Sequence, residues 1–146
     1  MQNVIEDLRR TIDSYYDRLA LLTEEASAEP VSTGKWSPRE LIGHLIDSAS
    51  NNHQRFVRAQ LDGPHTFPGY EQESWVARQG YKNESWADLT ALWKSYNLHL
   101  LHVISRMSND KLDVLCTIAA GDPVTLRFIA EDYVSHLKHH LEQIVA

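Results

Sequence analysis

Two histidines one helical turn apart, His136 and His140, lie near the C-terminal end of the chain in the segment HLKHHLEQI. Side chains at positions i and i+4 share one face of an α-helix, so both imidazoles could bind the same divalent cation. A third histidine, His44, lies much earlier in the chain, in the segment WSPRELIGHLID. Three imidazole ligands leave at least one coordination position of such an ion open to water or to a substrate. The spacing therefore suggests a metal site with catalytic potential.

Helical geometry separates the clustered histidines from one another. Successive residues of an α-helix are about 100° apart, which places His140 about 40° from His136, within the arc that contains Tyr133 and Leu137. His139 lies about 300° from His136, away from that apolar arc. We therefore predict that His136 and His140 face the core and that His139 faces solvent.

A polar strip accompanies His44 on its predicted helix. His44 lies at the margin of the apolar face, and Ser48, Asn51 and Arg55 lie within about 40° of it. These side chains could line a binding pocket, or they could form a buried polar network without a ligand. Arg55 could also extend its charged end to the surface. Asp47, about 60° away on the other side, could brace an imidazole or face solvent.

The remaining histidines carry weaker signals. His99 lies beside the inner face of another predicted helix and is a candidate acid–base group or additional ligand. His53, His65 and His102 are interpreted as surface or loop residues. An inward histidine is also commonly a hydrogen-bonded core residue, and i,i+4 pairs arise by chance in a chain with eight histidines. Spacing alone thus leaves a metal site and histidines of an ordinary core both open.

The sequence predicts four helices that carry these candidate residues. Apolar residues recurring three and four apart predict helices at about 3–26, 37–62, 85–107 and from 125 to the C-terminus. The second helix has the clearest start, because Ser37 and Glu40 form a capping-box pattern and Pro38 occupies the first helical position. The four helices predict an all-α fold, with residues 1–146 forming one four-helix-bundle domain.

Two connections are of special interest. The stretch 62–84 is longer than an antiparallel helix pair requires, so we predict a crossover that returns along the bundle and makes the second and third helices parallel. A short helix is predicted within it at 73–79. The segment 115–126 contains Ala-Gly-Asp-Pro and is compatible with either a small hairpin or an irregular loop.

Composition narrows the possible partners. The 146 residues are 42% hydrophobic and carry a net charge of −6, which disfavours nucleic-acid binding because no basic patch is evident. No apolar run reaches the roughly 18–20 residues of a membrane span, and the N-terminal residues lack the pattern of a signal peptide. A single cysteine, Cys116, precludes an internal disulfide. We therefore predict a cytoplasmic protein with neither a membrane nor a nucleic-acid partner.

The order of three motifs resembles the DinB/YfiT-like family over nearly the whole chain. The motifs are GKWSPRELIGHLID, the W-x-x-Y-N pattern at 93–97 and DYVSHLKHHLEQI. The resemblance implies a four-helix bundle of up-down-down-up topology with a long crossover between its second and third helices. It also implies a homodimer and one divalent metal ion per chain, held by His44, His136 and His140. Zinc or nickel is the leading expectation for that ion, with manganese or iron as alternatives.

The resemblance also suggests classes of reaction. Family members include metal-dependent transferases that use low-molecular-weight thiols and a mycothiol-dependent isomerase. A bound divalent ion can lower the pKa of coordinated water toward ~7 or stabilise a thiolate, so we predict hydrolase-like or thiol S-transferase-like action on a small molecule. Because Cys116 is distant from the proposed ligands in sequence, a thiol would come from a cosubstrate. Arg55 could hold its carboxylate, with Ser48 and Asn51 donating hydrogen bonds.

A second class of function remains open from the sequence. The protein could be a non-catalytic, dimeric stress-response or binding protein in which the metal is structural. A fourth protein ligand that closes the coordination sphere would favour this alternative.

Overall fold

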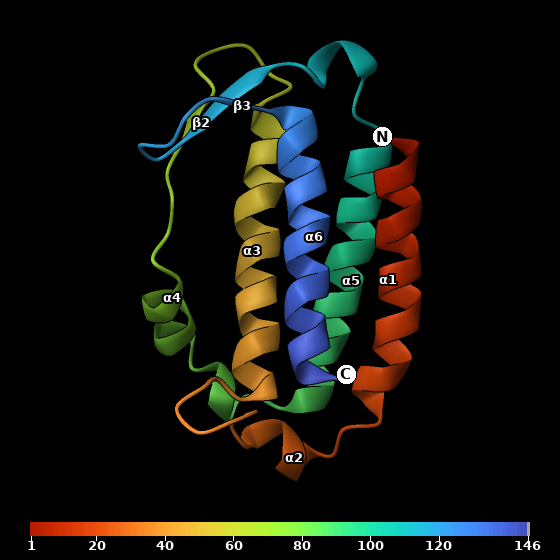
Figure 1. Ribbon diagram of the computed structural model, residues 1–146, viewed down its shortest axis with the longest axis vertical. Coiled ribbons are helices and arrows are strands. Elements are labelled where there is room, and N and C mark those ends of the chain that lie inside the picture. The colour runs from red at the N-terminus through yellow and green to blue at the C-terminus, as the bar shows by residue number, and fades with distance from the viewer. Residues whose placement is uncertain (146) are drawn as a thin grey trace.

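Four long helices form the bundle: α1 (Gln2–Ala20), α3 (Pro38–Arg58), α5 (Trp86–Ser105) and α6 (Leu126–Ile144). The computed structural model describes residues 1–145. In it, α1 and α3 each pack against both α5 and α6. Helices α3 and α5 run in the same direction, opposite to α1 and α6 (Figure 1). The predicted up-down-down-up four-helix bundle is therefore confirmed.

The core fills the space between these four helices. Its large side chains are fully buried and come from every long helix, among them Leu8, Ile12, Ile42, Leu45, Phe56, Leu89, Trp93, Leu100 and Leu126. Burying a side chain of this size stabilises the fold by about 1.5–3 kcal/mol relative to exposure. The buried side chains thus anchor the helices that carry the candidate site residues.

The start of α3 follows the sequence prediction. The Ser37 hydroxyl accepts a hydrogen bond from the backbone N–H of Glu40 at 3.3 Å, and the Glu40 carboxylate accepts one from the backbone N–H of Ser37 at 3.2 Å. Pro38 occupies the first turn, where its missing N–H costs no helical hydrogen bond. This reciprocal cap determines where α3 begins, and so fixes the helical phase of His44 two turns later.

The predicted first helix, 3–26, was too long. Helix α1 ends earlier, and a separate short helix α2 (Glu24–Ala28) follows after Thr23, whose hydroxyl caps it. The carboxylate of Glu24 accepts a hydrogen bond from the backbone N–H of Trp86 at 2.8 Å and pairs with Arg39 at 3.1 Å. The break lets Glu24 cap the distant α5, a tertiary contact that helical periodicity cannot reveal.

The long crossover returns along the outside of α3 (Figure 1). It contains β1 (Thr66–Phe67), α4 (Gln72–Gln79) and the 3₁₀ turn η1 (Tyr81–Asn83), and both α4 and η1 contact α3. The helix predicted at 73–79 is confirmed by α4. Gly80 ends α4 at a φ of 66°, in the left-handed region that glycine adopts without strain.

Between α5 and α6 the chain forms a 3₁₀ turn, η2 (Asn109–Lys111), and then a hairpin. Strand β2 (Leu115–Ile118) pairs antiparallel with β3 (Val124–Thr125), so the hairpin is the correct one of the two alternatives. The opposite edge of β2 pairs in parallel with β1 of the crossover. This pairing was not anticipated, because a two-residue strand has no periodicity of its own to detect.

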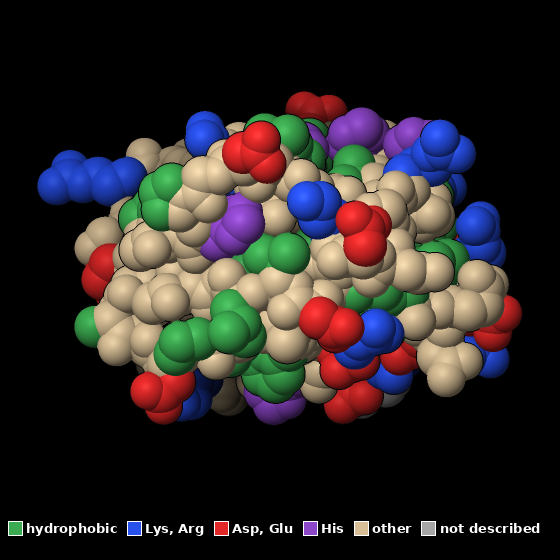
Figure 2. All heavy atoms as spheres, turned by 90° about the horizontal axis from the view of Figure 1, so that it is seen from above, with side chains coloured by type: hydrophobic (Ala, Val, Ile, Leu, Met, Phe, Trp, Pro, Cys, Tyr) green, Lys and Arg blue, Asp and Glu red, His purple; other side chains and the backbone are tan. Residues whose placement is uncertain are grey.

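The surface at the hairpin end carries charges of both signs. Viewed from above, Lys, Arg, Asp and Glu side chains are interspersed, without a large block of basic residues (Figure 2). Within residues 1–145, no helix is long and apolar enough to cross a membrane.

Candidate metal centre

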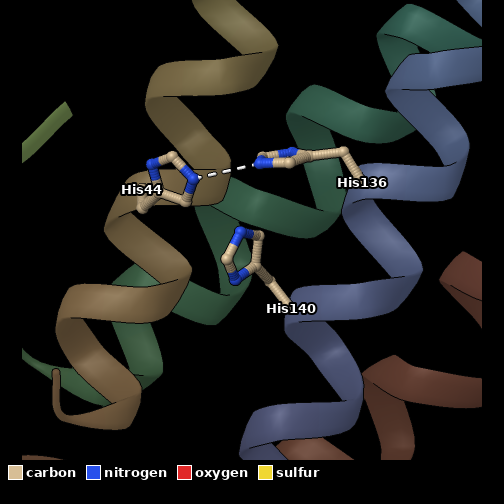
Figure 3. Close-up of side chains that lie close together, drawn as sticks. All are labelled: His44, His136 and His140. Atoms are coloured by element: carbon tan, nitrogen blue, oxygen red, sulfur yellow. Dashed lines mark hydrogen bonds between the residues drawn. The ribbon is translucent and has the colours of Figure 1, made fainter. Parts of the chain in front are cut away.

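Three imidazoles converge between α3 and α6. His44 extends from α3 toward α6, and His136 and His140 extend from successive turns of α6 toward it (Figure 3). The Nε2 atoms of His44 and His136 are 3.2 Å apart, and one ring nitrogen from each of the three residues lies within 4.8 Å of the others. His139, which precedes His140 on α6, is exposed, and its ring centroid lies 5.2 Å from that of His140. We call His44, His136 and His140 the histidine cluster.

The spacing of the ring nitrogens fits a shared cation. Two nitrogens that each bind one zinc ion at about 2.0–2.1 Å, at a tetrahedral angle, lie about 3.3 Å apart. The separation of 3.2 Å between His44 and His136 is close to that value. Among residues 1–145, no other His, Cys, Asp or Glu joins the group. The donor set thus consists of three imidazoles, a set that leaves a coordination position for another ligand.

Burial keeps the histidine cluster neutral. His44 is 0% exposed, and burial, followed by the neighbouring His136 and His140, lowers its pKa from 6.5 to about 4. Burial and the proximity of His140 lower the pKa of His136 to about 4 as well. The pKa of His140 is also lowered, chiefly by burial. Near neutral pH the cluster is therefore in the unprotonated form that metal binding requires.

These pKa values predict an acid-dependent loss of stability in the metal-free protein. In the unfolded chain the histidines take up protons near their ordinary pKa of 6.5, whereas folded His44 and His136 resist protonation down to about 4. The free energy of unfolding should be highest above pH 6.5 and fall as the pH decreases toward 4. One pKa unit corresponds to about 1.4 kcal/mol, so we expect a loss of a few kcal/mol.

Urea unfolding of the metal-free protein over this pH range measures the effect. A His44→Gln, His136→Gln double variant should show a shallower decline, and His139→Gln should behave like the parent protein. The same pH dependence in the double variant and the parent would contradict the prediction.

Gln143 orients one member of the cluster. Its side-chain oxygen lies 2.8 Å from Nδ1 of His140, one helical turn away on α6. An amide oxygen can only accept, so Nδ1 of His140 donates the hydrogen and Nε2 retains its lone pair for the cluster.

Removing this partner should weaken metal binding without harming the fold. Gln143 is exposed, so Gln143→Ala is expected to leave the stability nearly unchanged and to reduce metal affinity by about tenfold, as the loss of other outer hydrogen bonds does. Competition titration against a chromophoric chelator measures the affinity. Glu142→Ala, a neighbouring exposed position on α6, serves as the control. Equal affinities for the two variants would show that Gln143 has no such role.

Asp47 faces the interior rather than solvent. It is 2% exposed, and its Oδ1 accepts hydrogen bonds from the Tyr81 hydroxyl at 2.7 Å and from the Gln79 amide. Burial raises the pKa of this carboxyl group. Its second oxygen, Oδ2, and Nδ1 of His44 are both buried and have no hydrogen-bond partner among residues 1–145. Asp47 therefore connects the crossover to α3 one turn after His44.

A cavity of about 280 Å³ borders the histidine cluster. His136 lines it, together with Ser48 and Arg55 of the predicted polar strip. Asn51 does not line this cavity; its amide donates to the backbone carbonyl of Asp47 at 2.9 Å. Asn52 lines the cavity instead. The signal for Asn52 was available, because it lies four residues after Ser48, on the same helix face.

His99 does not join the histidine cluster or line either of the cavities beside it. It is exposed on α5, where its ring lies 5.3 Å from that of His53 and 6.3 Å from that of His102. The neighbouring Asn97 points inward instead, and its side-chain oxygen accepts a hydrogen bond from the buried Tyr133 hydroxyl at 2.6 Å. The packing of α5 thus turns His99 away from the site.

A second cavity, of about 610 Å³, borders the other end of the cluster. Its lining includes His140, Gln143, Lys35 and Trp36, and the Trp36 ring lies 5.2 Å from that of His44. Gln72, the first residue of α4, lines both cavities. The crossover therefore helps to form both of them.

The fold and the cluster together define a class of protein, an up-down-down-up helical bundle with three converging imidazoles between two of its helices. The chain belongs to the DinB superfamily, whose sequence model matches residues 7–144. A protein from Oceanobacillus iheyensis that is provisionally named a metal-dependent hydrolase is 26% identical over 147 aligned positions. The alignment covers 96% of this chain and 84% of that protein.

Two solved structures share the fold. YfiT from Bacillus subtilis, described as a probable metal-dependent hydrolase with an unusual four-helix bundle topology, superposes with a TM-score of 0.85 at 19% identity. That match covers 98% of this chain and 82% of YfiT. The mycothiol-dependent maleylpyruvate isomerase superposes with a TM-score of 0.79 at 16% identity, over 99% of this chain and 60% of the isomerase.

Proposed function

We propose that this protein binds one divalent metal ion per chain through His44, His136 and His140 and acts on a small molecule at that ion. The observation that carries the proposal is the convergence of three ring nitrogens within 4.8 Å, two of them 3.2 Å apart. Lowered pKa values keep the imidazoles unprotonated, as ligands must be. The metal-dependent relatives add support from outside this chain.

Each part of the site has a distinct role in this proposal. When bound, a divalent ion supplies Lewis acidity, which lowers the pKa of a coordinated water or thiol. His44, His136 and His140 hold the ion, and Gln143 fixes the proton of His140 on Nδ1. The cavity lined by His136 receives the substrate beside the cluster. Zinc or nickel is our leading assignment, and iron is an alternative, because imidazole suits these ions. Manganese is a further alternative, although it generally prefers oxygen ligands.

The reaction is hydrolase-like or thiol S-transferase-like in this proposal. Cys116 is 0% exposed in β2 and burial raises its pKa, so this thiol is unsuited to act as the nucleophile. A low-molecular-weight thiol would therefore enter as a cosubstrate. The two cavities that border the cluster offer room for two different molecules. We further propose that the protein is cytoplasmic and that its single-domain chains form a homodimer. Sedimentation tests the homodimer.

The alternative function, a purely structural metal, requires a different set of ligands. Structural zinc sites are normally closed by four protein ligands, whereas only three residues form the group among those described. This favours an open coordination position, and with it catalysis.

Metal content and ligand exchange test the proposal. Protein reconstituted with zinc, nickel, manganese or ferrous iron should contain one ion per chain by elemental analysis. In the cobalt-loaded protein, an added thiol such as 2-mercaptoethanol should change the visible spectrum, because it enters an open position. Failure to take up any of these metals would refute the proposal, and a spectrum indifferent to thiols would favour the structural alternative.

A further inference from the structure

We propose that Arg55 binds a carboxylate group of the ligand in the cavity beside the histidine cluster. The inference deepens the proposed function by naming a substrate class, a small molecule with an apolar body and one carboxylate remote from its reacting group. Only the identification of this ligand as the substrate rests on that proposed function. The binding of a carboxylate at Arg55 can be tested without any metal.

Arg55 is a buried cation without an anionic partner. It is 8% exposed, and no Asp or Glu lies within ion-pair distance of it among residues 1–145. Its hydrogen bonds are to neutral groups and are long, 3.3 Å to the side-chain oxygen of Asn52 and 3.4 Å to the backbone oxygen of Pro68. A guanidinium group has five N–H donors in a planar fork that matches a carboxylate. Much of this capacity is unused in the folded protein.

The cavity supplies complementary groups around Arg55. Ser48 and Tyr70 also line it, and their hydroxyl groups can donate hydrogen bonds to an anion. The amide nitrogen of Asn52, another lining residue, already donates to the backbone oxygen of Ser48 at 2.9 Å. Asp132 is its one acidic residue within the described part of the chain, and it is exposed on α6. The buried end of the cavity is therefore positive and its rim is negative. This arrangement favours a ligand that places one carboxylate inside and has no second anionic group near the rim.

The rest of the lining indicates the body of the ligand. The apolar members are Ile118, Val124, Phe128 and Ile129. A volume of about 280 Å³ is slightly below the usual range of about 300–1,000 Å³ for ligand pockets, which favours a small ligand. A small aliphatic or aromatic carboxylate fits both properties.

The position of Arg55 along α3 separates the carboxylate from the cluster. Arg55 follows His44 by eleven residues, so their Cα atoms are about 16.5 Å apart along the helix at a rise of 1.5 Å per residue. Side chains on a helix lean toward its N-terminus, which directs Arg55 back toward His44. His136 lines the same cavity. A ligand held at Arg55 thus reaches the cluster with a group several bonds away from its carboxylate.

Paired probes of equal shape test the proposal. Hexanoate and its neutral analogue hexanamide would be titrated into the metal-free protein while the Arg55 Nε–H resonance is followed by NMR. We expect saturable binding of hexanoate, at least tenfold tighter than that of hexanamide, with a shift of this resonance. Equal affinities, or hexanoate binding that leaves the resonance unmoved, would overturn the proposal. A titration with inorganic phosphate distinguishes the anions, since tighter binding of phosphate would contradict a carboxylate site.

Variants at two charges separate recognition from stability. Arg55→Met should abolish the preference for hexanoate, and Asp132→Asn should strengthen hexanoate binding by a few fold because it removes a repelling charge. Arg55→Met should also keep or raise the melting temperature, because the charge that it removes has no partner to lose. If Arg55→Met does not fold, Arg55→Lys provides the second test. It keeps the charge but loses the fork, so the preference should weaken markedly, and an unchanged preference would refute the proposal.

The outcomes distinguish this inference from the proposed function. A protein that binds hexanoate through Arg55 but takes up no metal would refute only the proposed function. A protein that binds one metal ion per chain but does not discriminate hexanoate from hexanamide would refute only the carboxylate site.

Discussion

Replacing His44 with alanine is expected to reduce the metal content from one divalent ion per chain to nearly none. His44 comes from α3, whereas the other two imidazoles of the cluster share α6, so its loss leaves a two-residue site on one helix. A zinc site with only two protein ligands loses the coordination that holds the ion. We expect the affinity to fall by about a thousandfold or more, at about 4 kcal/mol per thousandfold. Elemental analysis after dialysis measures the content.

The matched control is His139→Ala. It removes the same kind of side chain from the same segment of α6, but at an exposed position, and should leave the metal content unchanged. His136→Ala should reproduce the loss seen with His44→Ala. Circular dichroism of each metal-free variant separates loss of the site from loss of the fold. Full metal content in a folded His44→Ala variant would refute the assignment of this ligand.

Gly43→Ala is expected to destabilise the protein by about 2 kcal/mol or more, the scale of overpacking in a core. In the interior of a helix, alanine is normally more stable than glycine by about 0.5–1 kcal/mol, so the expected sign is reversed here. The reason is the close approach of Tyr81, because a Cβ at Gly43 would lie 2.0 Å from Cδ2 of its ring. Tyr81 would have to move, which would strain or break its hydrogen bond to Asp47. Urea unfolding measures the change.

A double-mutant cycle tests this cause. In a Tyr81→Ala background the obstacle is gone, so adding Gly43→Ala should be neutral or stabilising, as in an ordinary helix. Equal costs in both backgrounds would locate the strain elsewhere. A Gly43→Ala protein as stable as the parent would contradict the close packing of η1 on α3.

Much of the bundle could be predicted because its signals are local. The capping box at Ser37 and Glu40 fixed the start of α3, and the 3.6-residue period of apolar side chains located the other long helices. The excess length of the connector correctly indicated parallel second and third helices. The break after α1 escaped prediction because it serves a contact with Trp86, far away in the sequence.

The residues that line the pocket could also be predicted only in part. Helical angles placed Ser48 and Arg55 on one strip, and both line the cavity next to His136. The same angles also predicted that Asn51 and His99 could line the pocket, but neither does. The amide of Asn51 bonds to its own helix, and His99 lies beside His53. The packing of the neighbouring helices decides which side chains reach the cavity. A helical wheel gives the direction of a side chain but not the position of the partner helix.

The four long helices and their order were predictable from apolar periodicity, and the inward direction of His136 and His140 was predictable because helical phase depends only on residue number. The convergence of the three histidines could not be predicted locally. Nε2 of His44 lies 3.2 Å from Nε2 of His136, and one ring nitrogen of each of the three residues lies within 4.8 Å of the others, because α3 packs against α6. Tertiary structure also decided that Asp47 is buried under the crossover and that Arg55 has no acidic partner among residues 1–145. Contacts between segments that are distant in the sequence arise from packing, so the local pattern of residues does not predict them.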